Sequence, residues 1–145
     1  MKKPSGSIAQ MNYGEMLYPL DHPSMKEFSD SLDAVYTLAA EDSGFIWRIP
    51  DDQLERELIE NGCDRLTSAT VSVWDSYESL KRFTYQGLHG EFLKRSSEWF
   101  RKIEGPQLVI WPVDIAEQPS FRVALERLQH LKSHGNTVRA FGWID

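Results

Sequence analysis

The sequence lacks most features that point directly to a function. Its 145 residues include a single cysteine, Cys63, which excludes an internal disulfide and is typical of a reducing compartment. Acidic residues outnumber basic ones by 22 to 16, so the net charge of -6 provides no basic surface for nucleic acid or an anionic membrane. No apolar run approaches the roughly 18 residues of a membrane span. These absences predict a cytoplasmic protein that binds neither nucleic acid nor membrane.

Motifs for phosphate, metal or nucleophilic chemistry are also missing. The sequence contains no glycine-rich phosphate loop, no zinc-ligand spacing and no Ser-His-Asp order. His130 and His134 are four residues apart, but no third ligand is near, and both end a predicted helix where positive charge is favourable. We therefore predict no metal site, and we expect no catalytic role for Cys63 in its loop.

The chain length fits one domain with one hydrophobic core. Residues 1–7 are polar and are predicted to form a disordered tail, which leaves residues 8–145 as a single domain. The hydrophobic content of 41% and the five tryptophans provide ample material for its core.

The stretch from Ser68 to Phe100 organises the predicted fold. Residues 69–74 alternate between two faces and predict a strand. Asp75 then begins a capping box, three residues before Glu78, and a helix is expected to follow. After a glycine break, a second helical run is predicted to carry one histidine among aromatic residues on a single face: His89, Phe92, Leu93, Ser96, Trp99 and Phe100.

Periodicity predicts the remaining elements. Strands are expected at residues 8–13, 45–49, 107–111 and 140–144. A helix beginning near Ser24 is expected to end at Gly44 in the left-handed conformation, and a second is expected between Ser120 and Gly135. The apolar stripe of the first helix comprises Met25, Phe28, Leu32, Val35, Leu38 and Ala39. Residues 51–60 are predicted to form either an acidic surface helix or part of a long loop.

This order of elements predicts an α+β fold, a ferredoxin-like split β-α-β sheet with an added C-terminal helix and strand. Helices in that arrangement lie on one face of the sheet. The strands are nevertheless apolar on both faces, as where Val109 and Trp111 oppose Ile110. A bare face of this kind would be an exposed apolar patch. We therefore expect a homodimer in which two sheets pack together, burying on the order of 1,600 Å².

Six runs of residues carry a family resemblance across nearly the whole chain: Ile8–Gly14, Gly44–Arg48, Val71–Ser76, Phe83–His89, Glu98–Phe100 and Leu108–Trp111. Together they resemble the dimeric α+β barrel superfamily, which includes antibiotic-biosynthesis monooxygenases and haem-degrading monooxygenases. More narrowly, they resemble a bacterial domain family of unknown function within it. The resemblance implies a homodimeric barrel with a pocket between sheet and helices, and it implies no established activity.

The resemblance also bears on cofactors. In the haem-degrading relatives a histidine on the second main helix ligates iron, and His89 falls at a comparable place. Outside that helix no haem-enzyme motif is present, so we predict no cofactor, with haem as the alternative.

His89 and Tyr85 are the candidate catalytic residues. A neutral imidazole near pH 7 suits a general base, a hydrogen-bond donor to substrate or a haem ligand, and Tyr85 would relay protons. In the alternative interpretation, His89 is a core residue bonded to a backbone carbonyl or to Tyr85.

Arg48 is the candidate for binding the polar end of a substrate. It either binds a carboxylate or phosphate, or it pairs with an acidic residue of the sheet or of a partner. His89 and Arg48 are expected to face one cavity. Aromatic residues are predicted to line that cavity or to form the core and the dimer interface: Trp47, Trp74, Phe92, Trp99 and Trp111.

Two functions are compatible with these residues. The first is a monooxygenase-like enzyme acting on a small hydrophobic molecule, and the second is a non-catalytic module for small-molecule binding or dimerisation. A pocket of several hundred Å³ would favour ligand binding, whereas a filled interior would favour the structural role.

Overall fold

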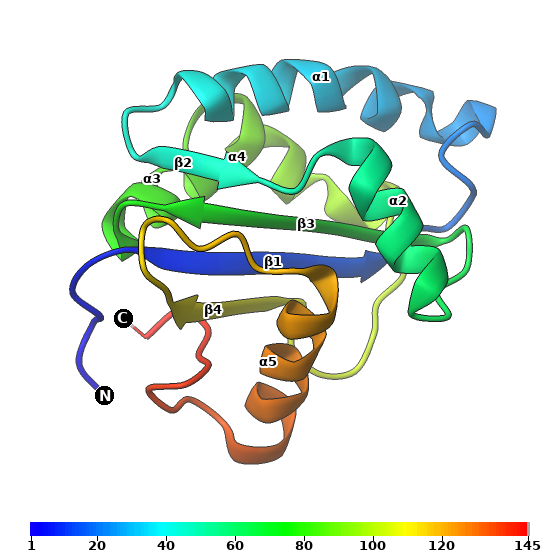
Figure 1. The fold of residues 1–145 in the computed structure, drawn as a ribbon. Coiled ribbons are helices and arrows are strands. Elements are labelled where there is room, and N and C mark those ends of the chain that lie inside the picture. Colours follow the sequence, from blue (N-terminus) through cyan, green and yellow to red (C-terminus); the bar gives the residue numbers. More distant parts are fainter. Residues whose placement is uncertain (145) are drawn as a thin grey trace.

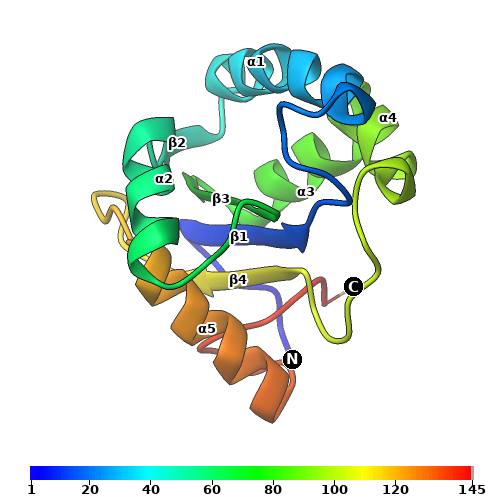
Figure 2. The ribbon, with the colours of Figure 1, turned by 90° about the vertical axis from the view of Figure 1, so that its right-hand side faces the viewer.

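A computed structural model describes residues 1–144 of the chain (Figures 1 and 2). Within these residues one antiparallel sheet has the strand order β2-β3-β1-β4. Its strands are β1 (Ile8–Glu15), β2 (Phe45–Arg48), β3 (Thr67–Trp74) and β4 (Leu108–Pro112). This is the ferredoxin-like order, and the predicted α+β fold class is confirmed. Residues 1–7 form neither helix nor strand.

Helices cover both faces of the sheet (Figures 1 and 2). One face carries α1 (Lys26–Glu41), α3 (Tyr77–Tyr85) and α4 (Gly87–Lys94), with short 3-10 turns η1 (Pro23–Met25) and η2 (Ser96–Glu98). The opposite face carries α2 (Asp51–Glu60) and α5 (Phe121–His134). Successive strand residues point to opposite faces, so β1 directs Ala9 and Met11 toward α2 and α5, and Ile8 toward α1 and α3.

The prediction that one sheet face is bare within a single chain is wrong. Val109 and Trp111 are 0% and 1% exposed, because Phe121 and Leu128 of α5 pack over them. The sequence showed that both faces were apolar, and the chain covers the second face with its own helices. A homodimer therefore stays a prediction, but covering the sheet no longer requires it.

Two predicted helix ends are shifted. The first helix ends at Glu41 with Asp42 as its extended C-cap, and Gly44 does not have a positive φ. Helix α3 begins after Ser76, whose Oγ accepts a hydrogen bond from the Ser79 amide at 3.1 Å. Asp75 is therefore not the cap. Its backbone amide donates to the Gly44 carbonyl at 2.8 Å, so Asp75 still belongs to the end of the sheet.

In the C-terminal third of the chain the elements lie where the sequence pattern predicts them, except for the last strand. Ser120 caps α5 by accepting from the Val123 amide, and Gly135 ends it with φ +69°, as predicted. Residues 140–144 do not form a full strand: Phe141 makes an isolated two-bond bridge to Ile110.

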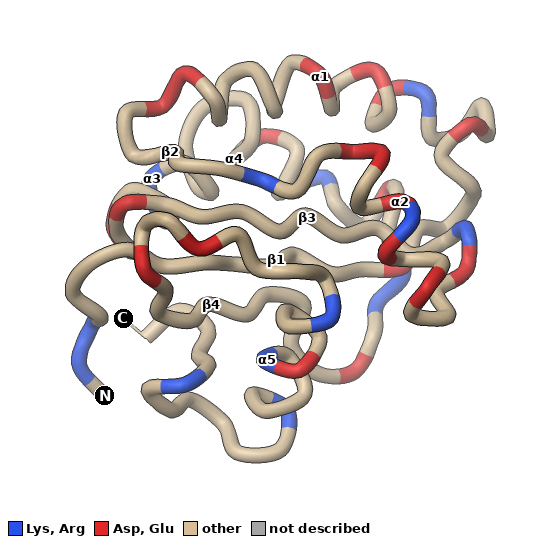
Figure 3. Tube along the Cα trace, viewed as in Figure 1, with Lys and Arg blue, Asp and Glu red and all other residues tan. Residues whose placement is uncertain are grey.

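The surface carries mixed charge. Acidic residues are spread along α1 and α2, with basic residues between them (Figure 3). Of the helices described in residues 1–144, none is both long and apolar enough to span a membrane.

Candidate functional site

Solvent reaches the middle of the sheet on the face that carries α1. Asn12 lies in central strand β1, between Thr70 of β3 and Leu108 of β4, and it is nevertheless exposed. It shares this face with Gln10, two residues away, to which it is hydrogen-bonded. A residue in the middle of a central strand is exposed only where the covering layer stands away from it. We call the solvent-accessible region around Asn12, on the face that carries α1, the hollow.

Helix α1 forms the roof of the hollow. Ala39 is its only buried residue, while Phe28, Leu32 and Val35, which share the inward face by helical spacing, are half-buried. Phe28 packs against Trp99 at one end, with ring centroids 5.6 Å apart, and Ala39 joins a separate apolar cluster at the other end. Within the part of the chain that is described, Leu32 and Val35 pack against neither cluster. The hollow is thus a gap between two apolar clusters.

A chain of hydrogen bonds forms its polar floor. The Asn12 amide donates to Gln10 Oε1 at 2.9 Å, and Gln10 Nε2 donates to Ser72 Oγ at 2.7 Å and to the Thr70 carbonyl at 3.3 Å. The indole of Trp74 also donates to Ser72 Oγ, at 2.9 Å. Gln10 and Ser72 are only 2% and 4% exposed. Buried networks of this kind fix side chains in one arrangement when every member is bonded.

His89 on α4 has the features of a neutral base. Its Nδ1 lies 2.8 Å from the Thr84 carbonyl, which can only accept, so Nδ1 carries the proton and Nε2 has the free lone pair. Burial lowers the pKa of His89 below its ordinary value, although the bond to Thr84 opposes the shift. Its Nε2 has no partner in the described chain, and no buried side-chain polar atom there lacks one, so Nε2 reaches solvent.

Contacts between rings connect His89 to the floor of the hollow. Its ring lies 5.2 Å from that of Phe83, which in turn lies 5.2 Å from Trp74. Tyr85, the predicted proton relay, is half-exposed and packs on Trp143 at 5.6 Å. No hydrogen bond joins Tyr85 to His89 among residues 1–144, so the structure does not bring the two candidate catalytic residues together.

Arg48 lies on the same sheet face, at its edge. It is in register with Ser72, which is in register with Gln10, so the three form one row across the sheet. Its guanidinium lies 3.9 Å from the ring centroid of Tyr36 and pairs with Asp51 at 2.7 Å. Its acidic partner therefore belongs to α2, and not to the sheet or to a partner subunit as one of the two interpretations had it. Arg48 also lines a groove of about 530 Å³ between α1 and β2, which does not include His89.

The predicted aromatic residues are divided between the two faces. Trp74 belongs to the apolar cluster at one end of the hollow, and Phe92 and Trp99 belong to the cluster at the other end. Trp47 and Trp111 lie on the opposite face, in the core beneath α2 and α5. The structure therefore brings three of these five residues to the hollow.

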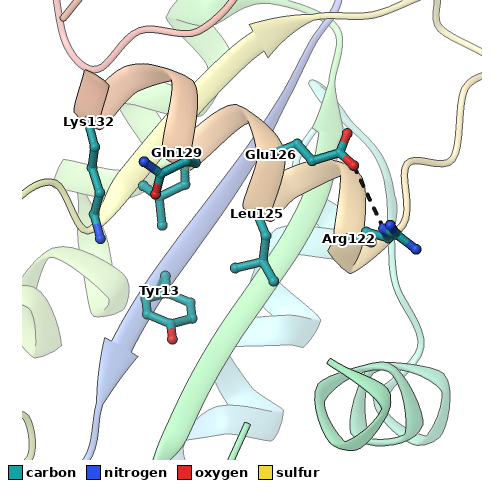
Figure 4. A pocket seen from close by; sticks show the side chains of 7 residues that line it. Tyr13, Arg122, Leu125, Glu126, Gln129 and Lys132 are labelled. Atoms are coloured by element: carbon teal, nitrogen blue, oxygen red, sulfur yellow. Dashed lines mark ion pairs between the residues drawn. The ribbon is translucent and has the colours of Figure 1, made fainter. Parts of the chain in front are cut away.

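A second groove, of about 460 Å³, lies on the face of α5 (Figure 4). Tyr13 of β1 lines this groove together with Leu125 and Lys132 of α5, and its hydroxyl is at the end of the ring away from them. Burial raises the pKa of Tyr13 and that of the neighbouring Cys63 thiol, so neither is activated as a nucleophile at neutral pH. His130 and His134 stack at 4.3 Å, and no group of three metal-ligating side chains occurs in residues 1–144.

Comparison with known families matches residues 7–145 to a domain of unknown function, DUF3291. The chain belongs to this family. The match covers all the elements described above, and it agrees with the resemblance seen in the sequence. Comparison with curated protein sequences gave no significant match.

The DUF3291 fold is similar to a solved structure, the crystal structure of SnoaB, a cofactor-independent oxygenase from Streptomyces nogalater. The TM-score is 0.50 at 10% sequence identity, and the match covers 75% of this chain and 94% of SnoaB. At that identity the likeness concerns the fold alone. It agrees with the α+β fold that the sequence predicts.

The sequence did not single out the floor residues Asn12, Gln10 and Ser72. The signal for these residues in the sequence is that Gln10 and Asn12 are polar residues at alternate positions of one predicted strand. Thr70 and Ser72 form a similar pair in another predicted strand. Polar residues on an inward strand face are informative only once the register pairs Gln10 with Ser72 and Asn12 with Thr70.

Proposed function

We propose that this DUF3291 protein binds a small hydrophobic molecule in the hollow between α1 and the sheet. The observation that carries the proposal is the exposure of Asn12 in the middle of a central strand, on the sheet face whose helix α1 leaves Leu32 and Val35 only half-buried. Ligand sites typically combine apolar walls with a few placed polar groups. The hollow has this composition, with apolar clusters at both ends and a bonded amide on its floor.

Binding is tested with N-phenyl-1-naphthylamine, an uncharged probe whose fluorescence rises in an apolar site. We expect saturable binding with a Kd on the order of 100 µM or tighter. Leu32→Trp should weaken binding at least about 10-fold, because the indole would fill the space below the roof. The measurement is a fluorescence titration, with a thermal melt to establish that the variant is folded.

Leu38→Trp is the matched control, since Leu38 lies on the same helix but is 44% exposed. This variant should bind the probe as the wild type does. Equal loss of binding in both variants, or no saturable binding by the folded wild type, would contradict the proposal.

A cofactor-independent oxygenase is the second candidate, favoured by the neutral Nε2 of His89 and by the fold likeness to SnoaB. His89 would remove a proton from an activated C–H of a bound ring. The resulting carbanion would reduce dioxygen and form a C–O bond. With anthrone, a CH₂ group would become C=O, one oxygen atom entering the product and the other leaving as water. The substrate supplies all the electrons, so the reaction needs no cofactor.

Oxygen uptake with anthrone, corrected for spontaneous oxidation, tests this chemistry. Because burial lowers the pKa of His89, its basic form persists at neutral pH. We expect the midpoint of the fall in rate at acidic pH to lie below 6.5, the ordinary pKa of histidine. His89→Gln should lower the rate by roughly 10²- to 10⁴-fold while probe binding persists.

An unchanged rate in His89→Gln would exclude His89 as the base. Adding hemin to the same samples tests the haem alternative. A stoichiometric Soret band that is lost in His89→Gln would contradict the absence of a cofactor.

We retain the homodimer and the cytoplasmic location as proposals. Because α2 and α5 occupy the second sheet face, a second copy would have to dock on another surface. The single cysteine supports the location.

A further inference from the structure

The orientation of the Asn12 amide is fixed from inside the sheet. The Thr70 main-chain carbonyl can only accept, so the end of the Gln10 amide that faces it at 3.3 Å is the NH₂ group. The other end of Gln10 is then the oxygen, which also only accepts. Asn12, 2.9 Å away, must therefore turn its own NH₂ toward Gln10. Its carbonyl oxygen is left to face away from Gln10.

Gln10 cannot turn over to reverse this arrangement. It is 2% exposed, and its Nε2 also donates to Ser72 Oγ at 2.7 Å. A flipped amide would set its oxygen against the Thr70 carbonyl and its NH₂ against the NH₂ of Asn12. Gln10 is therefore a positioning residue, which sets the direction of the exposed amide without being exposed itself.

The groups left over define what a ligand meets on the floor. Asn12 retains its Oδ1 as an acceptor and one N–H as a donor, and neither has a partner in residues 1–144. Ser72 Oγ accepts from both Gln10 and Trp74, so its lone pairs are used and its proton remains to be donated. Helix α1 on the same face of the sheet adds half-buried apolar side chains, including Leu32.

We propose that the hollow selects flat, uncharged rings that carry a hydrogen-bond donor beside an acceptor, of which a lactam is the simplest example. This deepens the proposed function and rests on it. The N–H of a lactam donates to Asn12 Oδ1 and its C=O accepts from Asn12 Nδ2, so both free groups are satisfied by one edge of the ligand. A carboxylate would present only acceptors and would place its charge against Oδ1.

Three bicyclic molecules of nearly equal size test the inference by displacing N-phenyl-1-naphthylamine. Naphthalene has no polar atom, quinoline has one acceptor, and 2-quinolinone has a donor beside an acceptor. We expect 2-quinolinone to bind roughly 10-fold tighter than either of the others, the value of one or two net hydrogen bonds. Asn12→Ala should abolish the preference, so that the three molecules bind with affinities within about 2-fold of one another.

Gln10→Met tests the positioning role. It preserves side-chain size but frees the Asn12 amide, so the preference for 2-quinolinone should fall while naphthalene binding persists. A purely structural role would instead change all three affinities together. The control is Asn61→Ala, which removes an exposed amide at the C-cap of α2 that donates to the Glu57 carbonyl.

The outcomes separate the two levels of the proposal. Equal displacement by all three molecules would overturn the inference but leave ligand binding intact. Failure of every molecule and of the probe to bind would overturn the proposed function, and the inference with it. A preference for 2-quinolinone that survives in Asn12→Ala would also overturn the inference.

Discussion

Replacement of Trp111 by alanine is expected to lower the free energy of unfolding by about 3–5 kcal/mol, the range for truncating a buried aromatic side chain. Trp111 is 1% exposed in the single chain and packs in the core that Phe121 and Leu128 of α5 close. Truncation would leave a cavity beneath a helix that is held by other large side chains and cannot collapse fully. Urea denaturation followed by fluorescence measures the loss.

The dependence on protein concentration decides what covers Trp111. Because α5 of the same chain covers it, the difference between the melting temperatures of the wild type and of Trp111→Ala should not change over a 100-fold range of concentration, whether or not the chain dimerises through another surface. If the core instead formed between the two sheets of a dimer, the substitution would weaken the dimer, and that difference would depend on concentration. Val138→Ala, at a side chain that is 74% exposed, should change stability by less than about 0.5 kcal/mol.

Light scattering on the same samples tests the homodimer itself. A stable monomer at micromolar concentration would contradict that prediction. A dimer whose melting is concentration-dependent while Trp111→Ala costs less than about 1 kcal/mol would contradict the coverage by α5.

Strand positions could be predicted because the period of two reports burial on each face. Ala9 and Met11 alternate with Ile8 and Gln10, and β1 begins at the predicted residue. The ends of α5 were predictable for a local reason as well, since a serine cap and a left-handed glycine depend only on adjacent backbone.

What covers an apolar face could not be predicted in the same way. Alternation shows that Val109 and Trp111 are buried, but it does not distinguish a helix of the same chain from a second copy. Residues 51–60 carry too few apolar side chains to identify a covering helix, and only Leu54 of α2 is fully buried.

The candidate site was predictable in part. His89 was predicted to be either functional or bonded to a backbone carbonyl. Its Nδ1 does bond to the Thr84 carbonyl, and its Nε2 is left free. The hollow depends on strand register and on how far α1 stands from the sheet, neither of which appears in local spacing. Leu38 illustrates the limit: it belongs to the apolar stripe predicted for α1, yet it is 44% exposed.

Gly44 illustrates how one residue can be required for a reason other than the predicted one. A left-handed C-terminal glycine was expected, but Gly44 has no positive φ. A Cβ at this position would overlap the Cβ and Oγ of Ser79 on α3 and would lie 2.9 Å from Oδ1 of Asp75. The backbone immediately before β2 therefore approaches α3 more closely than any side chain allows.

Gly44→Ala is accordingly expected to lower the free energy of unfolding by about 1–3 kcal/mol, the usual cost of overpacking. Ser79 cannot swing aside, because the overlap involves its Cβ, and Asp75 is tied to Gly44 by a 2.8 Å backbone hydrogen bond. Gly142→Ala is the matched control, since no atom lies within 4 Å of an added Cβ there.

Two further variants separate close packing from backbone conformation at this position. Asparagine tolerates the left-handed region, so Gly44→Asn should be milder than Gly44→Ala if that conformation were the requirement. Close packing predicts the reverse, because the larger side chain overlaps α3 more. Adding Ser79→Gly to Gly44→Ala should recover part of the lost stability, because it removes both overlapping atoms, and the coupling energy from the double-mutant cycle measures that relief. Additive losses in the cycle would show that the two positions do not compete for the same space.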